Sequence, residues 1–477
     1  MQKTLVILVV GLSPSMVGKH TPHLNALRRR GGLRPMRTVT PAVTCSVQAT
    51  LMTGLRPCDH GIVANGWYFR DQAQVWLWRQ ANQLISGKKI WDVARERNAN
   101  FTCAKMFWWY NMYSTADWSA TPRPVYRADG RKIPDHYTHP ADLHDELEAE
   151  LGEFPLFKFW GPMADISSSR WISDATCHVM RTREPTLTLS YLPHLDYNLQ
   201  RLGPDLNHPM IQQDLSQVDS LCGELIDVAD AQGQRIVVVS EYGITPVSDA
   251  VHINRCLREA GMLRVRNEKG QEQLDPGASD AFAVADHQIA HIYVNRPENL
   301  QRAKAIVESL DGVQMVLDEH SKNAAGLNHP RSGELVAVSD ANRWFSYYYW
   351  LDNSMAPDYS RAVDIHRKPG YDPVELFLDP GIKLPKLSVG GRLMLKKLGF
   401  RTLMNVISNQ DSALVRGSHG RPTDNPEHGP LVMSSEAALL PDKELDSTQF
   451  KSLVLDHIFG PICKAEEVSA VASQPAA

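Results

Sequence analysis

The chain has 477 residues, and its 50 Lys and Arg against 54 Asp and Glu leave a formal net charge of −4 at pH 7. A balance this close to neutral gives no electrostatic reason to expect nucleic acid as the main partner. With 43% hydrophobic and 22% charged residues, the composition excludes disordered and fibrous proteins. The length allows about three domains, or one large α/β domain with an insertion.

The seven cysteines are an odd number and include no C-x-x-C pair. This pattern favours a reduced, cytoplasmic protein without a structural zinc site. The apolar run at residues 4–12 is followed by Pro14 and polar residues, so it predicts a buried strand rather than a signal peptide. No stretch reaches the roughly 18 apolar residues of a transmembrane helix. The sequence leaves the oligomeric state open.

Short apolar runs rich in β-branched residues predict buried strands at residues 4–10, 187–192, 236–240, 289–294, 335–339 and 430–433. Helix-like stretches lie at residues 20–30, 210–230 and 254–261. Continuous apolar strands alternating with amphipathic helices predict an α/β fold with a mostly parallel central sheet flanked by helices. Ligands bind such sheets at the carboxyl ends of the strands, so the residues just after each strand are the candidates for chemistry.

Residues 67–171 hold nine of the eleven tryptophans. We predict that they form an inserted, Trp-rich cap between two parts of the α/β core, residues 1–66 and 172–463. The cluster Phe-Trp-Trp-Tyr at 107–110 could line a wall for a large apolar substrate, but filling a protein interior is the more common use of such residues. Residues 464–477 are small and polar and predict a flexible tail.

Several motifs stand at predicted strand ends. Thr44 follows Pro-Ala-Val at 41–43 and precedes Thr-Gly-Leu-Arg-Pro-Cys-Asp-His-Gly-Ile-Val-Ala-Asn-Gly at 53–66. Further motifs are Tyr-Leu-Pro-His-Leu-Asp at 191–196, Ser-Glu-Tyr-Gly-Ile at 240–244 and Gly-Ser-His-Gly at 417–420. In this order and spacing they resemble the alkaline phosphatase superfamily, specifically its nucleotide pyrophosphatase/type I phosphodiesterase branch. The resemblance extends from the first strand to about residue 435 and implies an alkaline-phosphatase-like core.

The resemblance implies a nucleophile and its partner. Thr44 stands at the position of the threonine that forms a covalent phospho-enzyme, and Asn65 at that of the asparagine that donates a hydrogen bond to a phosphoryl oxygen. A threonine hydroxyl is a poor nucleophile near neutral pH unless a metal or a base lowers its pKa, and metals can neutralise the charge of the transition state.

The implied metal ligands depart from the family pattern. Asp196 and His419 match one zinc site, but Gln200 replaces its second histidine. In the other site Val10 replaces an aspartate, and Glu241-Tyr242 replaces an Asp-His pair. The remaining candidate ligands are Asp196, Gln200, Glu241 and His419. Their oxygen-rich chemistry suits Mg²⁺ or Mn²⁺, while the histidine favours Mn²⁺ or Zn²⁺. We therefore predict a divalent metal cofactor, with its identity and number left open.

Other residues could compensate for the lost ligands. The additional candidates are His194, His287, Asp364, His366, Arg367 and Lys368, of which the last two also offer cations for a phosphate. Alternatively, Glu241 and Tyr242 could act as a general base and a hydrogen-bond donor in place of metal electrostatics.

The leading function is therefore a metal-dependent hydrolase of phosphate esters or pyrophosphates that acts on a small phosphorylated substrate. One alternative is a non-catalytic binder of a phosphorylated ligand or a partner protein, because three ligand positions have changed. Another is a phosphonate hydrolase, since part of Gly-Glu-Leu-Val-Ala-Val-Ser at 333–339 also resembles phosphonoacetate hydrolases.

One further segment, residues 383–401, is both basic and apolar. It could touch a membrane surface or an anionic, lipid-like substrate. Its glycines and Pro385 weaken a long helix and favour a packing loop with a short helix.

Overall fold

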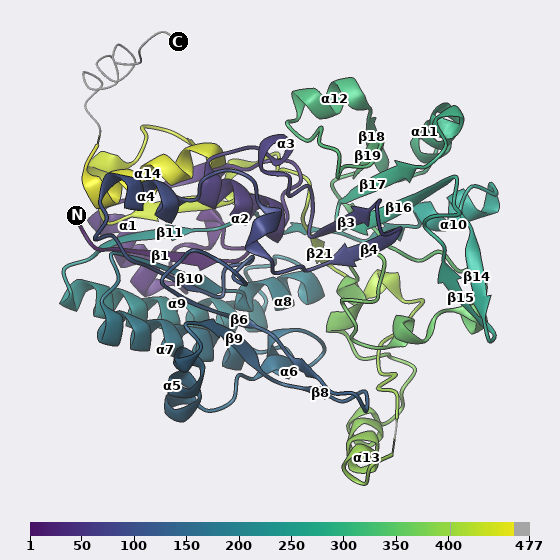
Figure 1. The fold of residues 1–477 in the computed structure, drawn as a ribbon, viewed down its shortest axis with the longest axis horizontal. Coiled ribbons are helices and arrows are strands. Elements are labelled where there is room, and N and C mark those ends of the chain that lie inside the picture. The colour runs from purple at the N-terminus through teal and green to yellow at the C-terminus, as the bar shows by residue number, and fades with distance from the viewer. Residues whose placement is uncertain (401, 462–477) are drawn as a thin grey trace.

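The computed structural model describes residues 1–400 and 402–461 (Figure 1). Its main body is built on a nine-stranded sheet with the order β23-β2-β22-β11-β1-β10-β5-β6-β9. In chain order these strands are β1 (Thr4–Val9), β2 (Gly32–Arg37), β5 (Cys103–Met106), β6 (Trp118–Pro122), β9 (His136–His139), β10 (Leu187–Leu192), β11 (Arg235–Val239), β22 (Leu431–Ser434) and β23 (Leu445–Asp446).

The centre of this sheet is parallel. β1 pairs in parallel with β10, from Thr4↔Leu187 to Val9↔Leu192, and on its other side with β11. β10 pairs in parallel with β5, and β5 with β6, while β22 and β9 run antiparallel to their neighbours. The predicted α/β fold with a mostly parallel central sheet is confirmed. Because the central strands are parallel, the ends of β1, β10 and β11 meet at one edge.

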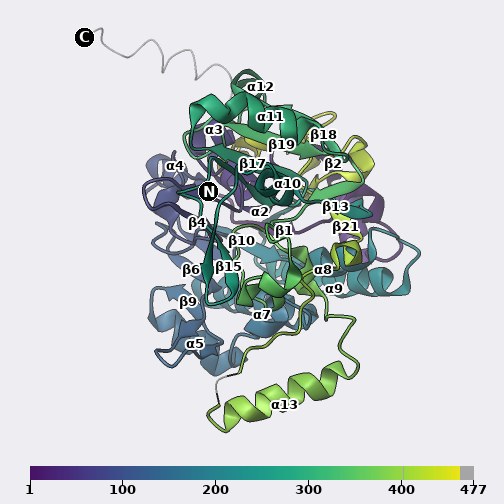
Figure 2. The same cartoon turned by 90° about the vertical axis from the view of Figure 1, so that its right-hand side faces the viewer.

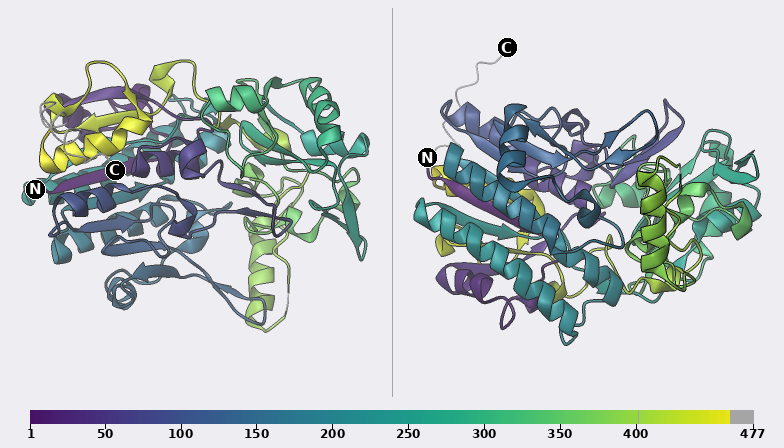
Figure 3. Two further views of the ribbon diagram at one scale, coloured as in Figure 1. Left: turned by 45° about the horizontal axis from the view of Figure 1, so that its top comes forward. Right: turned by 90° about the horizontal axis from the view of Figure 1, so that it is seen from below.

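Helices cover both faces of the sheet, which is why the central strands β1, β10 and β5 are buried along their whole length (Figure 1). α7, α8 and α9 lie on one face, seen from below in Figure 3, and α2, α4 and α14 on the other. The α-helices of the described residues are α1 (Pro22–Arg30), α2 (Thr44–Thr53), α3 (Pro57–His60), α4 (Ile90–Arg97), α5 (Asp142–Leu151), α6 (Leu156–Phe159), α7 (Ile166–Arg183), α8 (His194–Leu202), α9 (Pro209–Ala231), α10 (Ile253–Glu259), α11 (Leu300–Glu308), α12 (Glu319–Ala324), α13 (Pro385–Lys397) and α14 (Phe450–Phe459).

A second sheet forms a smaller lobe beside the main body (Figure 1). It has the order β16-β17-β19-β18 and is antiparallel. Its strands are β16 (Ala281–Asp286), β17 (Ile289–Val294), β18 (Val313–Leu317) and β19 (Leu335–Ser339). Residues 289–294 and 335–339 are thus buried strands as predicted, but they do not join the central sheet. β16 and β17 are joined by a two-residue turn, a connection that only antiparallel strands allow.

Short strand pairs complete the architecture. They join β3 (Gly66–Phe69) to β4 (Gln74–Leu77), β7 (Val125–Tyr126) to β8 (Lys132–Ile133), β12 (Thr245–Pro246) to β21 (Gly417–Ser418), β13 (Asp249–Val251) to β20 (Arg343–Phe345) and β14 (Val265–Glu268) to β15 (Gln271–Leu274).

The segment predicted to be an inserted cap, residues 67–171, is arranged differently. Three of its strands, β5, β6 and β9, extend the central sheet itself. β5, residues 103–106, joins the central sheet because it is fully buried and pairs in parallel with β10. The predicted tail, residues 464–477, lies outside the described residues.

Two negative findings apply to the described part of the chain. Its six cysteines are all free thiols. None of its helices combines the length and the apolar character needed to cross a membrane.

A buried ion cluster of Lys368, Asp372 and Glu375 stabilises the loop segment at residues 368–375. The Lys368 ammonium lies 2.7 Å from a carboxylate oxygen of Asp372 and 2.8 Å from one of Glu375. All three side chains are 1% exposed. Removing one partner of such a cluster leaves an uncompensated buried charge, which costs far more than losing a surface pair.

We predict that Lys368→Met lowers the free energy of unfolding by about 3–5 kcal/mol at neutral pH. The matched control is Arg367→Met, because this neighbouring arginine is half-exposed and its ion pairs lie at the surface; its effect should be below about 1 kcal/mol. Burial raises the pKa of Glu375. The Lys368→Met penalty should therefore shrink as the pH falls through neutral values and be smallest below about 4.3, the ordinary glutamate pKa, where the carboxyl is mostly neutral in both the folded and the unfolded state. Denaturant unfolding at several pH values measures this, and equal losses for the two variants would contradict it.

Candidate active site

Thr44 is the first residue of α2. The helix begins here because Val43 is extended, with φ −129° and ψ 155°. The first backbone N–H groups of a helix have no intrahelical acceptor and attract anions. Thr44 is 4% exposed, so its hydroxyl sits at a helix N-terminus inside the protein.

The Tyr242 phenol lies between Thr44 and Asp196. Its oxygen is 3.2 Å from Thr44 Oγ1 and 3.4 Å from Asp196 Oδ1. Tyr242 follows β11, and Asp196 is in α8 just after β10, so the two parallel strands on either side of β1 deliver both side chains to one edge. With the phenol proton donated to Asp196, the Thr44 hydroxyl donates to the phenol oxygen.

A second part of this network continues from Asp196. Its other oxygen, Oδ2, accepts a 2.8 Å hydrogen bond from Gln200 Nε2. The two residues are four apart on α8 and therefore share a helix face. Gln200 Oε1 in turn accepts a 3.2 Å hydrogen bond from the Tyr371 hydroxyl. A continuous hydrogen-bonded chain thus runs from Thr44 to Tyr371.

Glu241 lies beside this chain. Its Oε1 accepts a 2.5 Å hydrogen bond from Gln48 Nε2, and Gln48 Oε1 accepts one from the backbone N–H of Trp109 at 2.8 Å. Glu241 Oε2 has no partner among the described residues. Burial raises the pKa of Glu241 to about 8, with the hydrogen bond from Gln48 acting against it, and raises the pKa of Asp196 to about 7. Both carboxyl groups therefore retain a proton to higher pH than exposed carboxyls.

Asn65 is held by the second lobe. Its backbone N–H and its side-chain amide both donate to Asp286, at 2.7 and 3.0 Å, and its Oδ1 accepts from the backbone N–H of Cys45 at 2.9 Å. His287 Nδ1 lies 2.8 Å from Asp286 Oδ1. The end of β16 therefore positions the asparagine next to the start of α2.

His419 is clamped between aromatic rings. It stacks on Tyr242 with ring centroids 3.5 Å apart and contacts His287 at 3.7 Å. Its Nδ1 donates to the backbone carbonyl of Ala42 at 2.8 Å. This stack links the predicted C-terminal motif to the residues around Thr44.

Other predicted candidates have partners of their own. His194 Nε2 lies 3.1 Å from Asp214 Oδ1, and His366 lies against Tyr126. The structure pairs the two predicted phosphate-binding cations with carboxylates: Lys368 as described above, and Arg367 with Asp364. The phosphate-binding role predicted for these cations therefore gains no support from their contacts.

The side chains do not fit a two-metal centre. Val10 offers no donor, and both oxygens of Asp196 already accept hydrogen bonds from Tyr242 and Gln200. Within the described residues, groups of three His, Cys, Asp or Glu donors close enough to share an ion are Asp135-His136-His144 and His144-Asp145-Glu148. These groups lie around β9 and α5 and not at the ends of the central strands.

Aromatic rings cover the far end of the network. Tyr371 contacts Trp160 with ring centroids 5.6 Å apart and Trp78 at 6.1 Å, and Trp78 contacts Trp109 at 4.9 Å. Trp78, Trp160 and Tyr371 also line a small cavity. The cluster at 107–110 is buried in the core, as the more common use of aromatics predicts.

Comparison with known proteins agrees with this arrangement of motifs. The sequence model of the family described as type I phosphodiesterase / nucleotide pyrophosphatase matches residues 4–372. The chain belongs to this family. A curated relative in Schizosaccharomyces pombe, named an uncharacterized pyrophosphatase/phosphodiesterase, is 23% identical over 239 residues, 48% of this chain and 42% of that protein. The match thus spans less than half of that relative.

Solved structures share the fold of this phosphodiesterase-family chain. Phosphonoacetate hydrolase from Sinorhizobium meliloti 1021, in complex with phosphonoformate, has a TM-score of 0.59 at 15% identity, covering 96% of each chain. Murine ectonucleotide pyrophosphatase/phosphodiesterase 5, an inactive threonine-to-alanine variant in complex with AMP, has a TM-score of 0.58 at 14% identity. That comparison covers 96% of this chain and 95% of the murine one. The predicted superfamily is confirmed.

Three residues of the site had no role in the sequence prediction. Gln48 lies four residues after Thr44, so helical spacing from the nucleophile position could have indicated it. Asp286 is adjacent to His287, and an Asp-His pair at a strand end is a recognisable signal. Tyr371 comes from a loop, and no sequence pattern places it beside Gln200.

If the changed side chains, and not the backbone fold, prevent metal binding, then restoring the metal-ligand residues of the family pattern should restore zinc binding. We predict that the variant Val10→Asp/Gln200→His/Glu241→Asp/Tyr242→His takes up about two zinc ions per chain after zinc exposure and dialysis. The unchanged protein should retain far less than one at this site. Elemental analysis measures the difference, circular dichroism verifies folding, and retention of two zinc ions by the unchanged protein would overturn this interpretation.

Proposed function

We propose that this chain hydrolyses a phosphate ester or pyrophosphate bond in a small phosphorylated substrate, with Thr44 as the nucleophile. In this proposal Glu241 acts as the base and Tyr242 as a hydrogen-bond donor, in place of a two-metal centre. The observation that carries it is the position of the Thr44 hydroxyl, at the N-terminus of α2 and 3.2 Å from the Tyr242 phenol.

The chemistry needs a base for the Thr44 proton. Glu241 is the candidate, because its pKa of about 8 suits proton transfer near neutral pH and its Oε2 is free of a partner among the described residues. As the carboxylate takes the proton, Thr44 Oγ1 forms a bond to phosphorus, the bond to the leaving oxygen breaks, and that oxygen takes a proton from water while Glu241 releases its proton to the solvent. In the second step the regenerated carboxylate accepts a proton from the attacking water, the bond between phosphorus and Thr44 Oγ1 breaks, and the proton is returned to Thr44 Oγ1.

The anionic transition state needs donors. The Tyr242 phenol and the N–H groups of the first turn of α2 are the groups this chain offers, apart from the N–H groups of Cys45 and Val47, which donate to Asn65 Oδ1 and the Val43 carbonyl. Both are fixed before substrate arrives, since Tyr242 is held by Asp196 and by its stack on His419. Pre-positioned donors in a site without bulk water stabilise charge more effectively than donors in water.

The relatives support the substrate class. One structure of the same fold binds phosphonoformate, and another, inactive without its threonine, binds AMP. Phosphonates and phosphates present the same charged oxygens to a binding site. The experiment below therefore tests phosphonate hydrolysis at the same site as phosphate hydrolysis.

A second candidate function is non-catalytic binding of a phosphorylated ligand. It is favoured by one observation: the side-chain amide of Asn65 and both oxygens of Asp196 are already occupied by hydrogen bonds within the protein. A ligand would then have to displace existing partners, as in a site that is no longer shaped for turnover.

The test uses purified protein with 4-nitrophenyl phosphate, bis(4-nitrophenyl) phosphate and phosphonoacetate, each with and without excess EDTA. We expect turnover that EDTA does not abolish, and a loss of at least about 10³-fold in Thr44→Ala. The matched control is Thr53→Ala, another buried threonine of α2 whose hydroxyl bonds only within the helix and to the next loop; its rate should stay within a few-fold. Turnover that survives Thr44→Ala contradicts the covalent mechanism. Calorimetric binding of AMP without any turnover supports the second candidate instead.

A further inference from the structure

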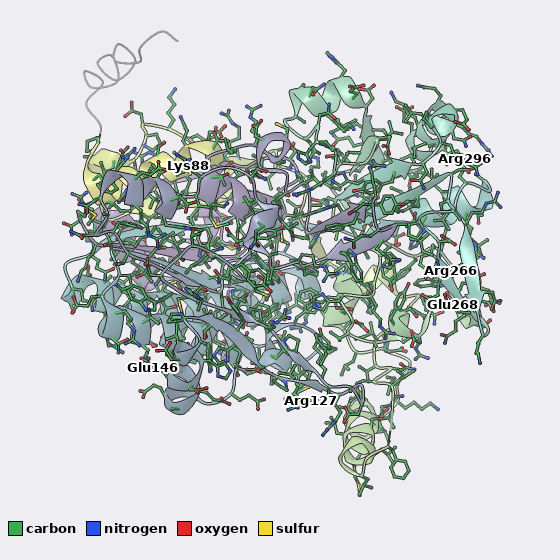
Figure 4. All side chains as sticks on the ribbon, viewed as in Figure 1. Lys88, Arg127, Glu146, Arg266, Glu268 and Arg296 are labelled. Atoms are coloured by element: carbon green, nitrogen blue, oxygen red, sulfur yellow. The ribbon has the colours of Figure 1, made fainter. Side chains whose placement is uncertain are left out.

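The helix α13 stands away from the rest of the molecule. It projects from the lobe that carries the second sheet in Figure 1, in Figure 2 and in the left view of Figure 3. The side-chain sticks of this segment extend into open space (Figure 4). A packing loop with a short helix was predicted here; the structure has one helix over residues 385–397, and many of its apolar side chains are exposed rather than packed.

The exposed side chains of this segment are large and apolar. We call residues 384–403 the basic-apolar arm. Its exposed hydrophobic residues, which are 42–71% exposed, are Leu384, Leu387, Leu393, Met394, Leu395, Leu398, Phe400 and Leu403. An apolar patch of this kind is unfavourable in water and marks an interaction surface.

The apolar residues form a stripe along one side of the helix. Leu387, Met394 and Leu398 follow each other at i, i+7 and i+11 and are 71%, 65% and 63% exposed. Val389 and Arg392 lie on another side: Val389 packs against a small hydrophobic cluster, and Arg392 donates to the backbone carbonyl of Leu403 at 3.0 Å. The helix therefore turns its stripe away from the protein.

The charge of this segment has one sign. Residues 383–401 contain six basic residues, and no acidic residue occurs between Asp379 and Asp411. The whole chain has a net charge of −4, so the positive charge is a local feature. A short helix with an apolar stripe and basic neighbours matches the surface of an anionic bilayer, where apolar side chains enter the interface and cations meet the headgroups.

We propose that the basic-apolar arm docks this protein on an anionic lipid membrane. The helix has 13 residues and contains Gly390 and Gly391, so it lies in the interface and does not span the bilayer. The proposal is independent of the chemistry at Thr44, because none of the residues that carry it belongs to that site.

The test measures co-sedimentation of the full chain with vesicles of phosphatidylcholine alone and of phosphatidylcholine mixed with phosphatidylserine. We expect binding to the mixed vesicles, weakened by added salt, and at least about tenfold weaker binding for Leu387→Gln/Met394→Gln/Leu398→Gln. The matched control changes three exposed apolar residues outside the arm, Met163, Met210 and Leu351, which are 53%, 48% and 51% exposed. The variant Met163→Gln/Met210→Gln/Leu351→Gln should bind as the unchanged protein does. Both variants should keep the thermal midpoint, since the replaced side chains are exposed.

Three outcomes would overturn the proposal. One is equal binding by the unchanged protein and the arm variant. Another is equal binding to neutral and mixed vesicles. The third is an absence of vesicle binding together with a dimer, seen by light scattering, that the arm variant loses, since a second copy of the chain would then cover the stripe.

Discussion

The hydrogen bonds of one phenol organise this site. Tyr242 sits between the nucleophile position, Thr44, and the carboxylate of Asp196, and its ring is stacked on His419. Thr44, Asp196 and Tyr242 meet there because they follow β2, β10 and β11, which run in the same direction through the sheet and end at one edge. The structure shows a hydrogen-bonded chain that starts at Thr44 and has Gln200 and Tyr371 at its far end, and we propose that this chain stands in for the metal pair that the family resemblance implies.

The substitutions at the family's ligand positions are consistent with one another. A metal brings charge that compensates buried carboxylates, so its loss requires other means of compensation. Gln200 supplies a donor to Asp196, and Gln48 supplies one to Glu241. Burial then raises the pKa of both carboxyl groups, which lets them hold protons near neutral pH. The result is a set of side chains suited to acid-base chemistry on a scaffold built for phosphoryl transfer.

The sequence predicted the fold class and the positions of the buried strands better than it predicted strand pairing and side-chain contacts. Apolar runs located residues 187–192, 289–294 and 335–339 with the bounds that the structure shows, because each is buried on both sides. Periodicity does not name a strand's partner, however, so the separate antiparallel sheet and the extension of the central sheet by β5 were not predicted. The motif residues at strand ends meet, since parallel strands place them together. Side-chain partners are harder to predict than strands. The sequence shows that Lys368 is a cation, but it does not show that Asp372 and Glu375 neutralise its charge.

The Tyr242 hydroxyl occupies the space between Thr44 and Asp196. The most direct measurement is a crystal structure of the protein grown with zinc, with anomalous diffraction recorded at the zinc absorption edge. We predict no anomalous peak between these two residues and a Tyr242 hydroxyl within hydrogen-bonding distance of Thr44 Oγ1. A strong peak bridging Thr44 and Asp196, with the Tyr242 ring turned away, would contradict the account.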